Sequence, residues 1–356
     1  MAFPKNMIIY NLTRDIGLMA ADAAEKLEKL LAEFSFSPCG DMDSKKYGFI
    51  PVIGGGDLFV HAVEGNMMIS ALMQTKAIPS AALKKKLTAK VKEVEAREGR
   101  PLKKKEQEAL KDDLMVDLMP HVLPIDKRTN GYILKGKYLV VDAPSHKAAE
   151  DFNALLRKAL GSLPVSPVES NKAVELVMTE WLKSGAPQGF TLGESAELKA
   201  ILDNGPVARF KNQDLTSDEV LKHLEAEKVV VKIAMNWKDR ISFTIKGDLS
   251  ITGMKFSEEL KDQNADIDRE DVAGRFDADF ALAVGEITLL IAALDDCFDF
   301  YKHEAGPVGE LPTVTPKTAD ADAIEGLVPD CCDSITITAG GNTLTISHAS
   351  EETDVS

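Results

Sequence analysis

The chain has 356 residues, an apolar share of 44% and a formal net charge of −15. This length favours two or three modules, and the apolar share is enough for a core. No stretch of about 18 uncharged apolar residues occurs, the start shows no secretion signal, and the four cysteines lack disulfide-framework or zinc spacing. These features predict a reduced cytoplasmic protein without a membrane span.

The charge is distributed unevenly along the chain. From Glu304 to Ser356, ten acidic residues stand against one lysine, a net charge of −9 that leaves −6 for the first 303 residues. From Lys76 to Lys111, twelve basic residues stand against five acidic ones, a net charge of +7. Phosphates respond to the local field within about 8–10 Å at physiological salt. The acidic total therefore does not exclude DNA binding by the body of the chain.

The first 160 residues read as an α+β unit interrupted by two long helices. Apolar and β-branched runs predict strands, and apolar residues three or four apart predict helices. The expected elements are a strand at 7–12, a helix at 16–34, strands at 58–63 and 67–73, helices at 80–98 and 101–119, strands at 132–134 and 138–142, and a helix at 147–160.

The two long helices are mostly polar, and Ser80 is the expected N-cap of the first. Such a pair cannot be buried on all sides, which predicts an antiparallel hairpin that projects from the body, here called the prong. Its narrow apolar seams are Leu83, Leu87, Val91, Val94, Leu110, Leu114 and Leu118.

Pro164 and Pro167 mark a boundary before a second α+β body. Its expected elements are helices at 173–183 and 217–226, a strand at 207–210, strands at 229–237, 241–246 and 250–256, and a long helix at 269–298. The long helix is apolar over much of its circumference, which is typical of a deeply buried helix or of one that meets a partner chain.

The segment Asp262–Phe280 holds seven acidic residues and precedes this apolar helix. A two-metal nuclease needs carboxylates converging on metal ions about 4 Å apart, and Asp266, Asp268, Glu270 and Asp271 could do so only if a turn folds them back. Alternatively, Asp266 or Asp268 caps the helix and the other two complement its dipole. We favour the cap, and predict no catalytic residue, metal or cofactor.

Basic residues on long helices are usually solvated faces. In the prong, however, the excess charge is predominantly positive. Further basic residues follow where the prong rejoins the sheet and near a later strand. These side chains suit phosphate contacts, which position a protein without reading sequence. Aromatic residues, at 6%, do not interleave with them, which disfavours single-strand stacking. The candidate DNA-binding residues are Lys76, Lys84, Lys85, Lys86, Lys103, Lys104, Lys105, Lys127, Arg128, Arg209, Lys211 and Gln213.

Five segments together resemble the recombination-associated RdgC family, in the family's order and across residues 1–300. They are KNMIIYNLTRDI, RKALGSLPV, TEWLKSGAPQGF, NQDLTSDEV and DQNADIDREDVAGRFDADF. The resemblance implies a non-enzymatic, nucleoid-associated homodimer that encircles double-stranded DNA without sequence preference and restrains a RecA-type recombinase. It also implies a central domain (1–75 and 121–162), a tip (76–120) and a base (163–300). The resemblance stops near Phe300, which leaves an added acidic tail (301–356).

By the same resemblance, contacts at the tips and bases close the ring, through Ile125, Leu290, Leu294 and Phe298. Two departures from the family pattern affect this expectation. The segment LPIDKRTNG, from Leu123, lacks the family's loop phenylalanine, so Ile125 or the pair Lys127-Arg128 takes its place. The family's paired lysines before glutamine become Lys211 and Asn212, with one charge fewer.

Two rival functions stay open: a metal-dependent nuclease, and a module that binds a recombinase or replication partner directly. The tail has its own prediction, because SITITAGGNTLTIS from Ser334 alternates around a turn and indicates a β-hairpin. The acidic tail either competes with DNA electrostatically, docks a partner, or is a tolerated extension.

Overall fold

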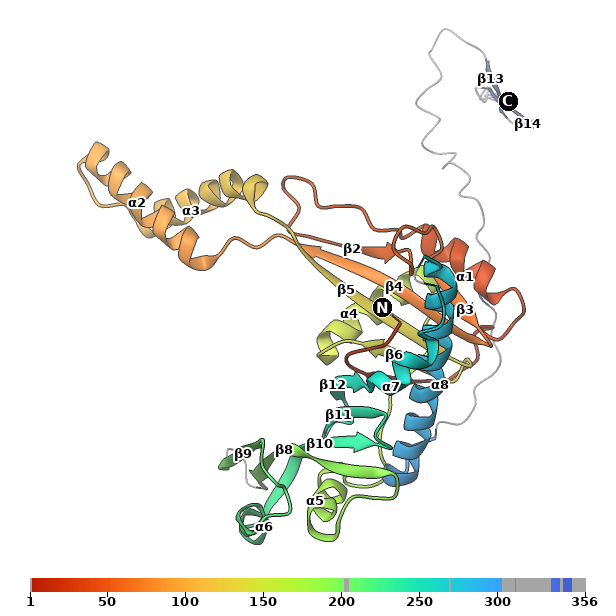
Figure 1. Cartoon of the computed structure of the whole chain (residues 1–356). Helices are drawn as coiled ribbons and strands as arrows, with labels where there is room; N and C mark the ends of the chain where they lie inside the picture. The colour runs from red at the N-terminus through yellow and green to blue at the C-terminus, as the bar shows by residue number, and fades with distance from the viewer. Residues whose placement is uncertain are drawn as a thin grey trace, which may run out of the picture. The chain divides into compact units, whose positions relative to one another are not determined.

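The structure is a computed structural model that describes residues 2–201, 205–268, 270–302, 311, 334–339 and 342–347. The chain divides into two compact units, Met1–Pro312 and Thr313–Ser356. The first unit contains two antiparallel sheets and packed helices, which confirms the predicted α+β class (Figure 1).

A seven-stranded sheet has the strand order β2-β4-β5-β6-β1-β7, with β3 also pairing with β4. Helices α1 and α4 pack on one of its faces, where Leu27 and Phe152 are fully buried. The bounds are β1 Ile8–Leu12, α1 Ala23–Ala32, β2 Lys45–Ile50, β3 Val60–Val63, β4 Asn66–Thr75, β5 Ile125–Leu134, β6 Tyr138–Asp142, α4 His146–Leu160 and β7 Val165–Pro167.

The second sheet has five strands in the order β12-β11-β10-β8-β9. Helices α5, α6 and α8 bury one of its faces, as the contact between Trp181 of α5 and Phe298 of α8 illustrates. The bounds are α5 Val174–Ser184, β8 Phe190–Ala200, β9 Val207–Lys211, α6 Asp218–Glu225, β10 Lys228–Trp237, β11 Ile241–Lys246, β12 Ile251–Phe256, α7 Glu258–Lys261, η2 Asp262–Asn264 and α8 Val272–Phe298.

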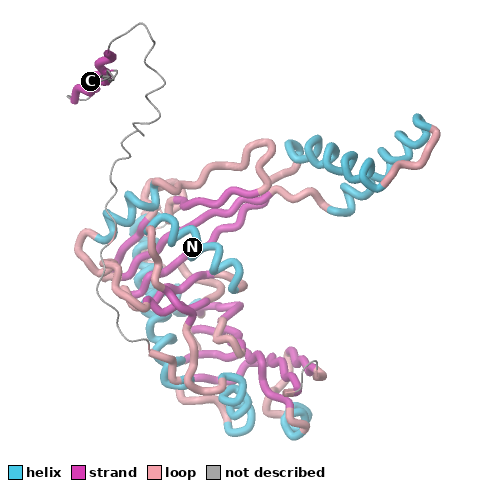
Figure 2. The backbone as a smooth tube through the Cα atoms, turned by 180° about the vertical axis from the view of Figure 1, so that it is seen from behind, coloured by secondary structure: helices cyan, strands magenta, loops and turns pink. Residues whose placement is uncertain are grey.

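Between β4 and β5 the chain forms the prong, from α2 (Ser80–Glu98), α3 (Lys104–Leu118) and the short η1 (Met119–His121). The two long helices lie side by side beyond the ends of the strands that carry them (Figures 1 and 2). Every predicted seam residue is half-buried and neither helix has a buried residue. The prong is thus a solvated hairpin, as the polar sequence predicts.

Several predicted boundaries were wrong for identifiable reasons. The helix expected from Ile16 begins only at Ala23, because residues 13–22 form turns. Ser80 is the first residue of α2 and not its cap, which is Pro79. The helix expected from Pro101 begins at Lys104. The segment after the prong is not a loop, because β5 already begins at Ile125.

Strands β2, β7 and β8 were not predicted. The edge strand β2 contains Gly48, where a Cβ atom would lie 2.5 Å from the Cα of Phe36, so close approach of a neighbouring segment displaces the usual β-branched residue. Strand β8 lacks clean alternation because its pairing with β10 shifts register twice, after Val230 and after Ile233. A bulged strand does not keep the period of two on which sequence detection depends.

The second unit contains the predicted hairpin, with β13 (Ser334–Ala339) paired to β14 (Asn342–Ser347) and Ile337 opposite Leu344. Most of the acidic tail lies outside the described residues. Leu311, however, is only 6% exposed and belongs to the core of the seven-stranded sheet. The first unit therefore extends past the boundary expected near 301.

Candidate nucleic-acid interface

The five-stranded sheet carries basic side chains on the face that its helices leave uncovered. Lys232 of β10 lies opposite Lys246 of β11 on one side and opposite Glu197 of β8 on the other, and Glu197 lies opposite Arg209 of β9. Directly opposite residues in a sheet project to the same face. We call Arg209, Glu197, Lys232 and Lys246 the basic row.

The alternation of the strands places this row outward. The neighbours Ile233, Ile245 and Phe210 are buried under the helices, so side chains one position away face solvent. Glu197 accepts contacts from both flanking cations: its Oε2 lies 3.2 Å from Arg209 Nε and 3.4 Å from Lys232 Nζ. Two of the three cations are thus partly neutralised, while Lys246 has no partner among the described residues.

Lys211 is exposed two residues beyond Arg209 in β9, on the same face of the sheet and opposite Ser195. Gln213, in contrast, donates from Nε2 to Glu219 at 2.9 Å, which occupies its amide.

Sequence reasoning named Arg209 and Lys211 but missed Lys232 and Lys246. The alternation of polar and apolar residues along β10 and β11 indicates that both lysines face solvent. The pairing of the two strands then places them side by side.

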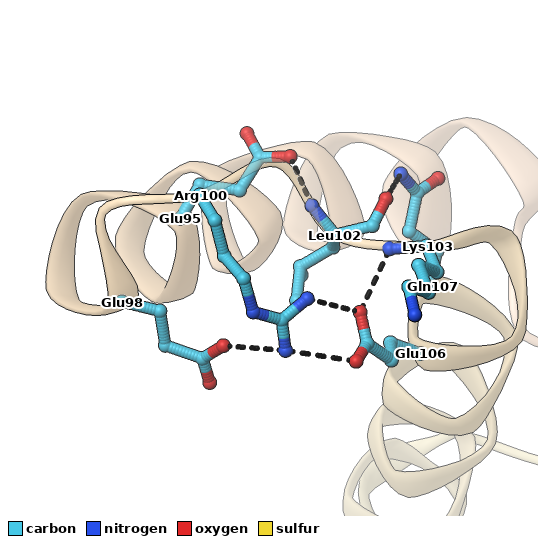
Figure 3. A network of polar contacts seen from close by, with 7 residues as sticks. All are labelled: Glu95, Glu98, Arg100, Leu102, Lys103, Glu106 and Gln107. Carbon is cyan, nitrogen blue, oxygen red and sulfur yellow. Dashed lines mark hydrogen bonds and ion pairs between the residues drawn. The ribbon is translucent and has the colours of Figure 1, made fainter.

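The six predicted prong lysines, Lys84–Lys86 and Lys103–Lys105, are exposed. The turn between the two helices is braced by a polar network (Figure 3). Arg100 donates to both oxygens of Glu106 at 2.9 and 2.8 Å and also pairs with Glu98 at 2.9 Å. The backbone N–H of Lys103 donates to Glu106 at 2.7 Å. Arg100 is therefore a structural residue and not a free cation.

This network perturbs the titration of Glu106. The hydrogen bond from Arg100, helped by the one from the Lys103 backbone, lowers the pKa of Glu106 to about 2. A second carboxylate, Glu95, accepts from the backbone N–H of Leu102 at 3.0 Å. The turn is thus held by contacts to the carboxylates of Glu106 and Glu95, while the lysines along the helices remain exposed to solvent.

Three of the predicted DNA-binding residues lie at the root of the prong, and their cationic groups differ in how freely they could reach a phosphate. Lys76 is only 8% exposed and donates from Nζ to the carbonyl of Gly40 at 2.8 Å. Lys127 and Arg128 are adjacent in β5, so they project to opposite faces of the sheet. Their adjacency in the sequence suggested one joint phosphate site, but side chains on opposite faces cannot form it.

The guanidinium of Arg128 is held by its own chain. It donates to Asn130 Oδ1 at 3.0 Å, to Ser70 Oγ at 2.8 Å and to the carbonyl of Val52. Burial lowers the pKa of Arg128. Lys127 and Arg128 are both exposed, but only the ammonium group of Lys127 lacks a contact among the described residues. Of the pair, only Lys127 has the geometry of a free phosphate contact.

The acidic segment does not gather into a metal site in the part of the chain that the structure describes, where no group of three or more candidate ligands occurs. The cap of α8 is Asp271, whose Oδ1 accepts from the N–H of Gly274 at 2.8 Å, and not Asp266 or Asp268. Asp279 accepts from Asn264 at 3.1 Å. Helix capping therefore accounts for part of the acidic run, but the cap lies three residues after Asp268.

The predicted interface residues divide into two groups. Leu290, Leu294 and Phe298 are 0%, 2% and 0% exposed and lie within the chain's own core. A side chain that its own subunit covers has no apolar surface left for a partner, so these three are core positions. Ile125, in contrast, is 67% exposed.

Further large apolar side chains are exposed where the prong meets the sheet. Leu123 is 85% exposed, and Met42 and Val116 are each more than half exposed. Met42 and Val116 also line a shallow hollow of about 270 Å³ together with Met115 and Met119. We call Met42, Val116, Leu123 and Ile125 the junction patch. Large exposed apolar side chains of this kind are candidates for an interaction surface.

The fold and this surface define an α+β protein with a solvated helical prong and an uncovered basic sheet face. Residues 1–300 match the family model described as "Putative exonuclease, RdgC". Proteins named "Recombination-associated protein RdgC" from Salmonella typhimurium (strain LT2) and Salmonella typhi are each 47% identical over 293 residues, which is 82% of this chain and 95% of theirs. The chain belongs to the RdgC family.

None of the described helices is long and apolar enough to cross a membrane.

Proposed function

We propose that this protein is a non-enzymatic, nucleoid-associated DNA-binding protein that contacts the phosphates of double-stranded DNA without reading its sequence. The observation that carries the proposal is the basic row, which lies on an uncovered sheet face beside the exposed Lys211. Lysine and arginine on a sheet suit phosphate oxygens, and phosphate contacts carry no sequence information. The exposed prong lysines and Lys127 supply a second set of such contacts.

We further propose that the protein acts as a homodimer that encircles the duplex and so restrains a RecA-type recombinase. The junction patch and the free side of β9 supply candidate contacts between subunits. Strand β9 pairs only with β8 among the described strands, and Val207 at its start is 44% exposed. The name of the relatives, which links them to recombination, supports this role.

The test is equilibrium binding of the full chain to two unrelated duplexes of equal length across a salt series, followed by fluorescence anisotropy. Both duplexes should bind equally at each salt concentration. The double variant Lys232→Gln/Lys246→Gln should reduce the slope of log K against log salt by about 0.9 per lost phosphate contact. The matched control Lys147→Gln/Lys183→Gln removes two exposed charges from α4 and α5 and should leave the slope unchanged.

Two results would contradict the proposal. One is a clear preference for one of the two duplexes. The other is shortening of an end-labelled duplex that depends on Mg²⁺ or Mn²⁺, which would support the exonuclease in the family description. Wild-type protein that binds neither duplex at low salt would also reject it.

A further inference from the structure

A shallow hollow lies at the root of the prong, between α3 and the loop that precedes β2. It is lined by Met42 of the loop and by Asp112, Met115, Val116 and Met119 at the end of the prong's second helix. Its volume of about 270 Å³ is below the range of roughly 300–1,000 Å³ that is usual for small-molecule sites. The hollow therefore suits an anchoring side chain of a partner protein better than a whole small ligand.

The helical wall of the hollow is one stripe along α3. Asp112, Met115, Val116 and Met119 are separated by three or four positions, so they lie on the same side of the helix. Val116 is 55% exposed, although it is apolar. The stripe thus has a carboxylate at one end and apolar side chains at the other.

The loop that carries Met42 is fastened to the end of β4. Lys76 donates from Nζ to the carbonyl of Gly40 at 2.8 Å, and the N–H of Cys39 donates to Oε1 of Gln74 at 2.6 Å. These contacts form the wall before a partner arrives, which lowers the entropic cost of docking. Methionine side chains are flexible and polarizable, so they can fit the shape of an incoming group.

The stripe is flanked by an excess of negative charge. From Lys111 to Leu118, three aspartates stand against one lysine, a net charge of −2. Asp112, Asp113 and Asp117 are exposed, and their carboxylates have no ion-pair partner among the described residues. Successive residues of a helix are about 100° apart around its axis, so Lys111 projects to the other side of the stripe from Asp113 and Asp117.

The direction of α3 adds to this negative potential. The C-terminal end of a helix carries a partial negative charge and favours cations, yet α3 has no basic residue in its last turn. The neighbouring loop does not supply free cations, because Lys46 pairs with Asp43 at 3.3 Å and Lys45 pairs with Asp151 at 3.5 Å. An apolar hollow and a negative helix end therefore adjoin each other.

We propose that this hollow docks an amphipathic helix of a partner protein that carries basic residues beside its apolar stripe. An apolar side chain of that helix enters between Met42 and Val116, as in other complexes of a helix with a groove. Lysine or arginine one turn away pairs with Asp112 and Asp113. Leu123 and Ile125 do not line the hollow, so this contact is separate from the subunit contact proposed for them, and it does not depend on DNA binding.

The test is a titration of the full chain with a synthetic amphipathic helix of leucine and lysine, about four turns long, followed by NMR of the methionine methyl groups. The methyl signals of Met42, Met115 and Met119 should shift and saturate together. The signal of Met235, buried in the five-stranded sheet, should stay in place. Because these signals report on the hollow itself, peptide bound elsewhere on this acidic chain is not counted.

Two variants separate the apolar and the charged parts of the contact. Val116→Gln removes an apolar wall, and Asp112→Asn/Asp113→Asn removes two charges. Each should weaken peptide binding by at least about threefold, since exposed contacts contribute modestly. The matched control Glu225→Gln/Glu259→Gln removes two exposed charges away from the prong and should bind the peptide as the wild type does.

A peptide with glutamate in place of lysine should not bind, and thermal unfolding of each variant checks that the fold is retained. The proposal is overturned if the methyl signals of the hollow do not shift, if the glutamate peptide binds as tightly, or if the control variant loses as much affinity as the hollow variants. It is also rejected if the same signals shift when the protein alone is diluted, because a second copy of the chain then occupies the hollow.

Discussion

At the scale of single residues, the basic row contains one carboxylate that opposes the phosphate contacts proposed for it. Glu197 lies between Arg209 and Lys232 and contacts both. The hydrogen bond from Arg209 holds the pKa of Glu197 below its usual value, with a smaller effect from Lys232. Glu197 is therefore ionised at neutral pH and, in the proposed DNA complex, would compete with phosphate for two of the three cations in the row.

Replacing this carboxylate by an amide should tighten DNA binding. In Glu197→Gln, both cations lose an anionic partner, so we expect a higher affinity at low salt and a salt slope steeper by up to about 0.9 for each additional phosphate contact. The measurement is the anisotropy titration described above. Glu225→Gln, an exposed change on α6, is the control. Equal affinities for Glu197→Gln and the control, with the wild type binding DNA, would reject the competition while leaving the proposed function intact.

At the scale of elements, neighbouring positions of α8 have opposite roles. The helix is apolar over a wide arc, and sequence alone does not separate its core from its surface. Leu290 is fully buried, while Leu289, the preceding residue, is 53% exposed. The difference follows from the 3.6-residue period of the helix and from the sheet that packs against only one side.

Truncating these two leucines should therefore give different results. Leu290→Ala should lower the free energy of unfolding by about 2–5 kcal/mol, because it removes buried methyl groups and leaves a cavity. Leu289→Ala should change it by less than about 0.5 kcal/mol, as surface substitutions usually do. Chemical unfolding followed by circular dichroism measures both. Similar losses for the two variants would mean that Leu289 is covered too, for example by a second subunit.

The turn of the prong provides a pH-dependent test of another element. Because the pKa of Glu106 is lowered to about 2, its contribution to the turn is present above the ordinary glutamate pKa of about 4.3 and is lost as the pH falls through about 2. An NMR titration of the Glu106 carboxyl carbon should show this low midpoint. In Arg100→Ala the midpoint should move up toward the ordinary value. A midpoint that is ordinary in the wild type would show that the ion pair does not form.

At the scale of the whole molecule, the seven- and five-stranded sheets share a hydrophobic cluster. Met68 and Tyr132 of the first sheet and Ile233 and Trp237 of the second belong to it together with Phe280 of α8. The central and base regions expected from the sequence are therefore joined by a common core. The apolar side chains of the junction patch remain exposed on this body.

Disrupting the junction patch should weaken self-association. Leu123→Asp/Ile125→Asp places two charges on side chains that are 85% and 67% exposed, so the fold should be retained while a subunit contact is lost. Sedimentation equilibrium should show a lower average mass than for the wild type. Leu176→Asp, a 57% exposed position on α5, is the control. A wild-type protein that is monomeric at high concentration would reject the homodimer.

The sequence by itself determined the α+β class, the solvated prong and most helices and strands of the first unit, because these depend on local periodicity and polarity. The bulged strand β8 and the edge strand β2 were missed, since their pairing depends on distant segments. Only the tertiary structure separated Lys127 from Arg128 and assigned Leu290 to the core. Only strand pairing placed Lys232 and Lys246 in one row with Arg209. The order of the strands and their register decide which residues lie opposite one another, and sequence separation does not.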